Sequence, residues 1–146
     1  MIFVVYKEKP SKPVKTPHCY QWDYNQTLCI EDVPCAITPE VHFWQEGLEK
    51  ALVVKGTFES NKHHHTVTAV IPNQMLQNAD PITAYLYDET AEEFGETISA
   101  YQIPIIEREQ PEDYVYAENG EPISPDDEFK IRRSTVDAER TDSVRN

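Results

Sequence analysis

The feature that most constrains the fold of this chain is a repeated alternation of apolar and polar side chains at the period of a β-strand. The alternation occupies four stretches: LVVKGTF at 52–58, HTVTAVI at 65–71, ITAYLYD at 82–88 and ETISAYQIPII at 96–106. Because successive side chains of a strand point to opposite faces, each stretch presents one apolar face to a core. Helical periodicity is nearly absent, and Met75 and Leu76 suit only a single helical turn.

Short β-rich runs and turn residues extend the same pattern to the rest of the chain. The additional strand candidates are Ile2–Tyr6, Tyr20–Tyr24, Leu28–Ile30 and Val41–Trp44. Prolines and glycines punctuate the runs roughly every ten residues, and Ser60–Lys62 predicts a hairpin turn. With 146 residues, the chain suffices for one domain with a modest core. We therefore predict an all-β fold, an antiparallel β-sandwich of the immunoglobulin-like or jelly-roll-like kind.

Two polar segments flank the predicted sandwich, which we place at residues 18–116. KEKPSKPVKTP at 7–17 has four lysines and three prolines, so residues 1–17 are expected to form a strand and an extended N-terminal arm. From Glu107 onward the chain has 12 acidic and 6 basic residues and few aliphatic ones. This composition predicts a polar C-terminal tail at 117–146 that has no core of its own.

The net charge and the lengths of the apolar runs argue against nucleic-acid and membrane partners, and the cysteine count argues against disulfides. The formal charge of −13 argues against nucleic acid, whose binding needs clustered lysine and arginine. No apolar run approaches the ~18–20 residues of a membrane span. The basic residues of MIFVVYKEKP follow its apolar run, unlike those of a signal peptide, so we expect cytoplasmic synthesis and no membrane partner. The odd number of cysteines predicts free and mostly buried thiols at Cys19, Cys29 and Cys35.

Three consecutive histidines, His63 to His65, raise the question of a metal site. Neighbouring residues of a strand point to opposite faces, so only His63 and His65 are expected to share a metal ion. His18, His42 or a cysteine would have to complete the site, but the cysteine spacing matches no zinc motif. The favoured alternative is the polar end of a hairpin between residues 58 and 67, and a milder functional alternative is a pH-sensitive contact made by the clustered histidines. We expect no metal.

Motifs for catalysis and for cofactor binding are missing from the sequence. It has no GxSxG, no HExxH and no cysteine in a catalytic context. The four glycines are scattered, so they form no glycine-rich phosphate loop. Acidic pairs such as Glu92-Glu93 and Asp126-Asp127 lie in polar loops that are typical of solvated surface. We predict a protein that is not an enzyme, with no catalytic residues and no cofactor.

Aromatic residues are frequent early in the chain and on the later strand candidates. They are Tyr20, Trp22, Tyr24, Phe43, Trp44, Tyr85, Tyr87 and Tyr101. Core packing is the first explanation for aromatic residues in a sandwich, and carbohydrate or protein binding are the alternatives. The segment Tyr114–Tyr116 follows the last strand candidate, and it is expected to lie across a neighbouring subunit or across its own sheet.

An ordered set of motifs resembles a known protein family. The set consists of VHF at 41–43, VIPN at 70–73, LQ at 76–77, PI at 81–82, AYLY at 84–87, IPI at 103–105, Arg108, Pro111 and DYVY at 113–116. Over about residues 28–116, this order resembles the N-terminal domain of baseplate upper proteins and related tail-associated proteins of phages and prophages of Gram-positive bacteria. The resemblance implies an all-β sandwich that attaches to a virion and contacts other structural proteins.

The resemblance and the polar arms together predict a non-enzymatic structural protein of a virion, associated with the baseplate or the tail. Capsid decoration or another head-associated role is one alternative, and binding of a carbohydrate or receptor through surface aromatic residues is another. We expect sandwich edges and arms to bind other virion proteins, within a homo-oligomer such as a trimer or a ring. The expected partner-binding residues are Tyr114, Tyr116, Phe129, Ile131, Arg132 and Arg133.

Overall fold

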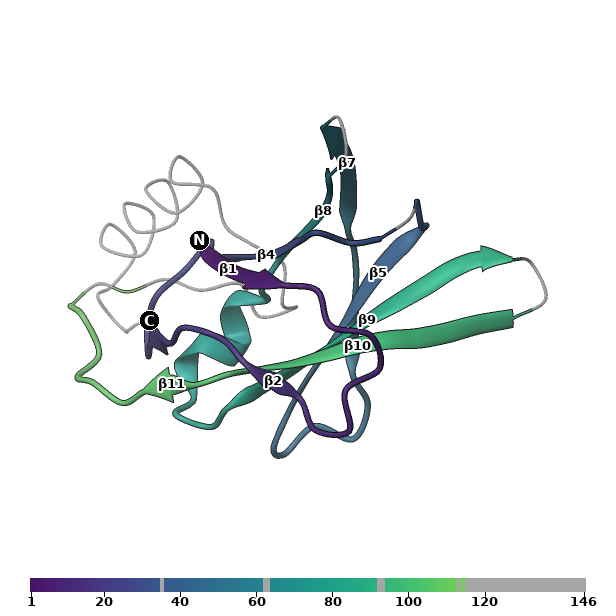
Figure 1. Ribbon diagram of the computed structural model, residues 1–146. Coiled ribbons are helices and arrows are strands. Elements are labelled where there is room, and N and C mark those ends of the chain that lie inside the picture. Colours follow the sequence, from purple (N-terminus) through teal and green to yellow (C-terminus); the bar gives the residue numbers. More distant parts are fainter. Residues whose placement is uncertain (35, 62–63, 92–93, 113, 115–146) are drawn as a thin grey trace, which may run out of the picture.

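The computed structural model of the chain describes residues 1–34, 36–61, 64–91, 94–112 and 114. Within these residues the elements are β1 (Ile2–Val5), β2 (Val14–Lys15), β3 (Cys19–Tyr20), β4 (Thr27–Glu31), β5 (Pro39–Gln45), β6 (Leu52–Lys55), β7 (Thr57–Asn61), β8 (His64–Val70), the 3₁₀ helix η1 (Asn73–Gln77), β9 (Ile82–Ala91), β10 (Phe94–Ile103) and β11 (Ile105–Ile106). The predicted all-β fold is confirmed (Figure 1). No helix in the described part of the chain is long and apolar enough to cross a membrane.

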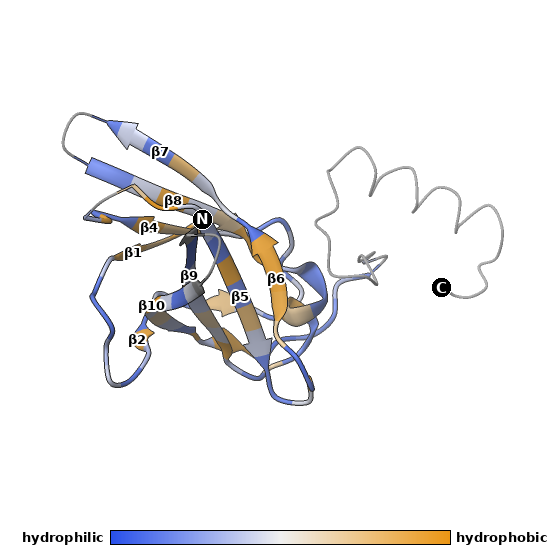
Figure 2. Cartoon of the chain, turned by 90° about the vertical axis from the view of Figure 1, so that its right-hand side faces the viewer, coloured by the Kyte–Doolittle hydropathy of each residue, from blue (hydrophilic) through white to orange (hydrophobic). Residues whose placement is uncertain are grey.

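The described strands form three sheets. Sheet A has four strands in the order β1-β4-β8-β7, sheet B has five in the order β2-β10-β9-β5-β6, and sheet C pairs β11 with β3. The core between sheets A and B takes the apolar side chains that alternate along each strand. From sheet A it includes Ile2, Leu28, Ile30, Val67 and Ala69, and from sheet B it includes Val41, Phe43, Ile82, Ala84, Leu86, Tyr101 and Ile103. Polar residues gather at loops and at the far end of the β7–β8 hairpin (Figure 2).

The prediction of a purely antiparallel sandwich is wrong, because three of the strand pairings are parallel: sheets A and B are mixed, and sheet C is a parallel pair. β1 runs parallel to β4, β2 to β10 and β3 to β11, whereas the five pairings among the remaining strands are antiparallel. The three parallel strands β1, β2 and β3 all come from the first 20 residues, which pass sheets A, B and C in turn. Each of them pairs with a strand far along the chain, so no hairpin turn dictates an antiparallel direction.

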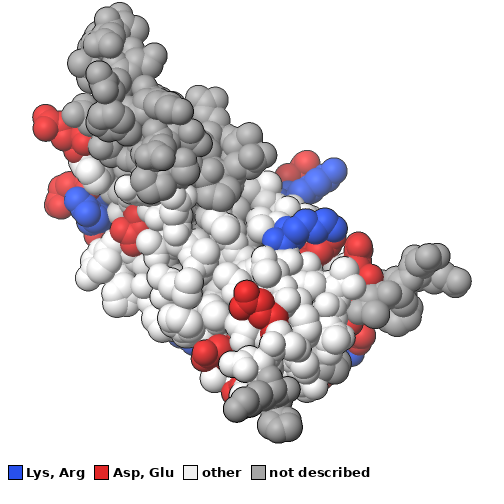
Figure 3. All heavy atoms as spheres, turned by 90° about the horizontal axis from the view of Figure 1, so that it is seen from above, with Lys and Arg blue, Asp and Glu red and all other residues white. Residues whose placement is uncertain are grey.

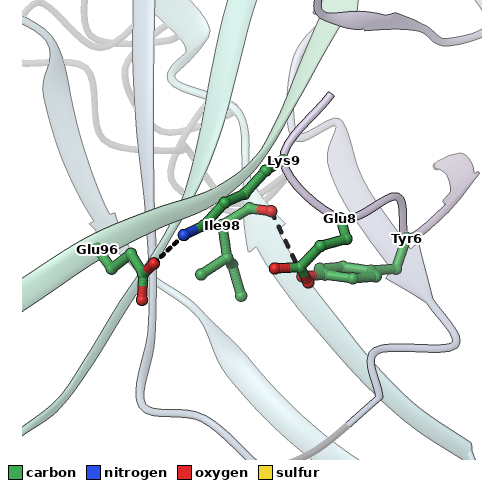
Figure 4. A network of polar contacts seen from close by, with 5 residues as sticks. All are labelled: Tyr6, Glu8, Lys9, Glu96 and Ile98. Carbon is green, nitrogen blue, oxygen red and sulfur yellow. Dashed lines mark hydrogen bonds and ion pairs between the residues drawn. The ribbon is translucent and has the colours of Figure 1, made fainter. Parts of the chain in front are cut away.

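The segment at 7–17 that was predicted as an arm bends at residues 8–9 and 11–12, where Lys9 has φ 37°, and it contacts β10 on both sides of these bends. The Lys9 N–H group donates to Ile98 O at 2.9 Å, and β2 continues this contact as the edge strand of sheet B. Figure 4 shows Lys9 paired with Glu96, and the Tyr6 hydroxyl beside Glu8 and Ile98 O. The lysine- and proline-rich residues therefore bind their own sheet.

A hydrogen bond from a buried serine of β10 also holds the segment at 7–17 against the sheet. Ser99 Oγ donates to Lys7 O at 2.6 Å and lies 2.8 Å from the hydroxyl oxygen of the fully buried Tyr101. Burial raises the pKa of the Tyr101 phenol, which therefore stays neutral and keeps this contact over a wide pH range. The segment at 7–17 is thus bound at its first residue, Lys7, to a buried side chain of β10.

Two continuous alternating runs are each divided between two sheets. The run at 52–58 contains β6, which pairs with β5 in sheet B, and the start of β7, which pairs with β8 in sheet A. Gly56 lies between them, and a Cβ atom there would be 3.2 Å from Val67 Cγ1 and 3.3 Å from Pro39 Cβ. The chain therefore crosses between sheets at a residue without a side chain. Pro104 divides the second run into β10 and β11, because proline has no N–H group to continue a ladder.

The predicted strand Tyr20–Tyr24 is wrong beyond Tyr20, where β3 ends. Trp22 has φ 77°, in the left-handed region, which breaks an extended conformation. Asp23 holds the turn, because its N–H group donates to Tyr20 O at 3.2 Å and its carboxylate accepts from Tyr20 N–H at 3.0 Å. The alternating aromatic residues of this stretch therefore belong to a turn held by an aspartate.

The single helical turn predicted around Met75 and Leu76 is confirmed by η1, in which both side chains are buried. Gln45, the last residue of β5, is 2% exposed and binds this segment. Its Nε2 group donates to Met75 O and to Asp80 O, both at 2.8 Å, and its Oε1 atom accepts from Asn78 Nδ2 at 3.0 Å. One buried amide thus fixes the segment from 75 to 80 to sheet B.

Candidate functional site

His64 and His65 begin β8 in the β7–β8 hairpin, one of two hairpins that project from the body (Figure 1). His64 pairs with Asn61 and His65 with Ser60, so the two imidazoles point to opposite faces. His64 Nδ1 lies 2.8 Å from Asp32 Oδ1, whereas His65 stacks on Phe58 with ring centroids 5.2 Å apart. The predicted polar hairpin end is confirmed for these two histidines. His63 lies outside the described residues.

In the part of the chain that it describes, the structure does not bring together the residues considered as candidate metal ligands. His18 contacts Tyr20 edge-on beside β3, and His42 lies on β5 in another sheet. Among the described residues, no three His, Cys, Asp or Glu side chains are grouped so that they could hold a metal ion. Cys19 and Cys29 are free and buried, as predicted, and Cys35 lies outside the described residues.

Of the predicted partner-binding residues, Tyr114 contacts its own chain. Its ring meets Trp22 edge-on with ring centroids 5.4 Å apart, and its hydroxyl donates to Asp23 O at 3.5 Å. Trp22 Nε1 donates to Arg108 O at 3.1 Å, so the turn after β3 also contacts the segment that follows β11. The other predicted partner-binding residues lie outside the described residues: Tyr116, Phe129, Ile131, Arg132 and Arg133.

A polar and aromatic row crosses the outer face of sheet B. Glu40 Oε2 accepts from Lys55 Nζ at 2.9 Å, and its Oε1 lies 3.0 Å from His42 Nε2. Hydrogen bonds from Lys55 and from His42 lower the pKa of the Glu40 carboxyl. The His42 imidazole stacks on Tyr87 with centroids 4.5 Å apart, and a Cβ atom at Gly95 would be 2.0 Å from the Tyr87 hydroxyl oxygen. The Tyr87 ring is therefore packed between His42 and Gly95, which favours a structural role.

This packing gives a direct prediction for Gly95. Gly95→Ala is expected to lower the free energy of unfolding by about 1 kcal/mol, because the new methyl group displaces Tyr87 from His42. Urea unfolding followed by tryptophan fluorescence measures the change. The same substitution in a Tyr87→Val background serves as the control, and there the cost should nearly vanish. An equal cost in both backgrounds would show that Tyr87 does not set the environment of Gly95.

The open edges of the two larger sheets differ in how they are protected from further strand pairing. β2 carries Lys15 and is flanked by Pro13 and Pro17, β6 carries Lys55, and β7 is polar and carries Glu59. Lysine, charge and proline are the usual devices that keep an edge strand from pairing with another chain. β1, with the sequence IFVV, has none of these devices, and no described strand pairs with its outer edge. Of the four outer strands of sheets A and B, β1 is therefore the unprotected one.

The side chains of β1 alternate between the core and solvent. Ile2 and Val4 are buried, whereas Phe3 and Val5 are 51% and 56% exposed on the outer face of sheet A. Tyr6 N–H donates to the carbonyl of β4 residue Glu31 at 2.8 Å. Backbone groups alternate sides along a strand, so those of Phe3 and Val5 face the open edge. Phe3 and Val5 thus offer both apolar side chains and backbone hydrogen-bonding groups to a partner; we call these two residues the β1 edge.

The surroundings of the β1 edge carry little charge for so acidic a chain. On sheet A, Phe3 lies beside Cys29, which in turn pairs with Thr68 of β8. β4 contains one acidic residue, Glu31, which pairs with Val5. On the molecule more generally, Figure 3 shows one face on which Asp and Glu side chains are dispersed among residues without a formal charge. An apolar strip within a chain of charge −13 is suited to a contact that excludes water.

Comparison with known proteins adds no family to this description. No protein-family model matches the sequence, and no curated protein matches it.

Proposed function

We propose that the chain is a non-enzymatic structural protein of a phage virion, associated with the baseplate or tail, that docks onto neighbouring subunits through its sheet edges. The order of motifs between residues 28 and 116, which resembles the N-terminal domain of baseplate upper proteins, supports the virion context. The β1 edge carries the docking part of the proposal, because among the outer strands of sheets A and B it is the apolar and unprotected one.

The energetics of the β1 edge suit a subunit of an ordered assembly. Covering a half-exposed Phe3 or Val5 gains on the order of 1 kcal/mol for each side chain, and each backbone hydrogen bond adds about 1 kcal/mol. A strand of four residues is therefore a weak contact once the entropy cost of association is included. In a virion the same contact recurs beside others, and the effective concentration of the partner makes a weak edge contact sufficient.

Particle incorporation tests this proposal. Phe3→Lys combined with Val5→Lys places the usual edge-protecting residue at both exposed positions, and it should leave the core unchanged because neither side chain is buried. Expressed in place of the natural chain in cells that produce the phage, this variant should enter particles about tenfold less than the unchanged chain. Quantitative mass spectrometry of purified particles measures the ratio.

Val53→Lys is the matched control for this experiment. Val53 is 58% exposed on edge strand β6, so the substitution adds one lysine, against two in the β1 variant, at a similar exposure on the other sheet. Circular dichroism and thermal unfolding establish that both variants are folded. The docking role of β1 would be refuted by full incorporation of the folded β1 variant, or by equal losses for the two variants.

A further inference from the structure

We propose that the first occupant of the β1 edge is a second copy of this chain, whose β1 pairs antiparallel with that of the first copy about a two-fold axis. The pairing joins the four-stranded sheet A of one copy to that of the second copy, which makes one continuous sheet. This inference rests on the docking role proposed above and names the partner for it. A two-fold pair is a closed symmetry, in which the same surface of each copy meets the other.

Backbone geometry selects the register of this pair. The N–H and C=O groups of Phe3 and Val5 face the open edge, whereas Val4, like Tyr6, faces β4. With the two-fold axis at Val4, Phe3 of one copy lies opposite Val5 of the second copy, and Val5 lies opposite Phe3. Each of these two opposed pairs exchanges two hydrogen bonds, so the register satisfies about four backbone bonds. The strand already has the length that this register needs.

The same register matches the faces of the two sheets. Directly opposed residues of neighbouring strands place their side chains on one face. Phe3 and Val5 of both copies therefore meet on the outer face, where all four side chains are apolar and half-exposed in the single chain. The two buried Val4 side chains meet on the core side. No charged residue opposes an apolar one within the paired strands.

Charge favours a second copy over a basic partner. A cationic partner is drawn to acidic surface, yet the β1 edge itself carries no charge in a chain of net charge −13. Two copies repel each other everywhere that both are acidic, and they approach with the least repulsion where both surfaces are neutral. Self-pairing should therefore strengthen with salt, whereas binding of a basic segment should weaken with salt.

Analytical ultracentrifugation of the full chain tests the inference. The unchanged chain should show a concentration-dependent monomer–dimer equilibrium that shifts toward dimer between about 0.1 M and about 1 M NaCl, as the Debye length falls from about 10 Å to about 3 Å. Val5→Lys should raise the dimer dissociation constant by about tenfold or more, and the Val53→Lys control should leave it unchanged. A chain that stays monomeric at every concentration and salt, a trimer or ring, or a dimer insensitive to Val5→Lys would overturn the inference.

The two proposals fail separately. A monomeric chain whose β1 variant is still excluded from particles removes self-pairing and leaves the docking role, with the strand of a different subunit at β1. A salt-strengthened dimer that is lost in Val5→Lys, together with normal incorporation of the β1 variant, supports self-pairing and removes the proposed docking role.

Discussion

The Gln45→Leu variant is expected to lose about 3 kcal/mol of unfolding free energy, although leucine is apolar and similar in volume. Gln45 is 2% exposed and makes three hydrogen bonds, two from its Nε2 group to the carbonyls of Met75 and Asp80 and one from Asn78 to its Oε1 atom. Leucine supplies none of them. Each buried polar group that is left without a partner costs about 1–3 kcal/mol.

Gln102→Leu is the matched control for this prediction. Gln102 lies on β10 in the same sheet, and it is only half-buried. The same chemical change there should alter the unfolding free energy by less than about 0.5 kcal/mol. Urea unfolding monitored by tryptophan fluorescence compares both variants with the unchanged chain. A cost below about 1 kcal/mol for Gln45→Leu would mean that water replaces the lost amide, and that the contact does not hold the segment from 75 to 80.

The sequence was sufficient to predict which residues are buried along the longer strands, but not how the strands are distributed among sheets. Alternation depends only on nearest neighbours in one strand, so the buried set Val67, Ala69 and Ile71 was predicted correctly. The run at 52–58 keeps its alternation while it crosses from sheet B to sheet A at Gly56. A local pattern contains no information on which sheet each half joins.

For the first 20 residues, the local sequence likewise did not predict the direction of the strands or the exposed β1 edge. Direction there is set by contacts with β4, β10 and β11, which local sequence does not reveal. IFVV is apolar at every position, which is typical of a strand buried on both faces. In the structure it lies at an edge, with Phe3 and Val5 exposed. Apolar residues on both faces of so short a strand were the one signal of the β1 edge in the sequence.

The second large effect is the contribution of Cys19 to the loss of stability at alkaline pH. This thiol is 3% exposed on β3, and its burial, followed by the negative charge of Asp23, raises its pKa to about 11 from an ordinary value of about 9. Between these two values the unfolded chain has lost the thiol proton and the folded chain still holds it. The folded state therefore binds more protons, and the unfolding free energy falls as the pH rises.

The expected loss from Cys19 is about 2–3 kcal/mol across the interval from about pH 9 to about pH 11, because each unit of pKa difference corresponds to about 1.4 kcal/mol. Urea unfolding under reducing conditions at a series of pH values measures this slope for the unchanged chain and for Cys19→Ala. Tyr101 and Cys29, whose pKa values are also raised by burial, are common to both proteins, so their contributions cancel in the difference. Cys19→Ala should be the less stable protein at pH 7, where the buried side chain is lost, and its disadvantage should shrink steadily above pH 9. Parallel curves for the two proteins over this interval would mean that the folded state tolerates the thiolate, and that burial does not raise the pKa of Cys19.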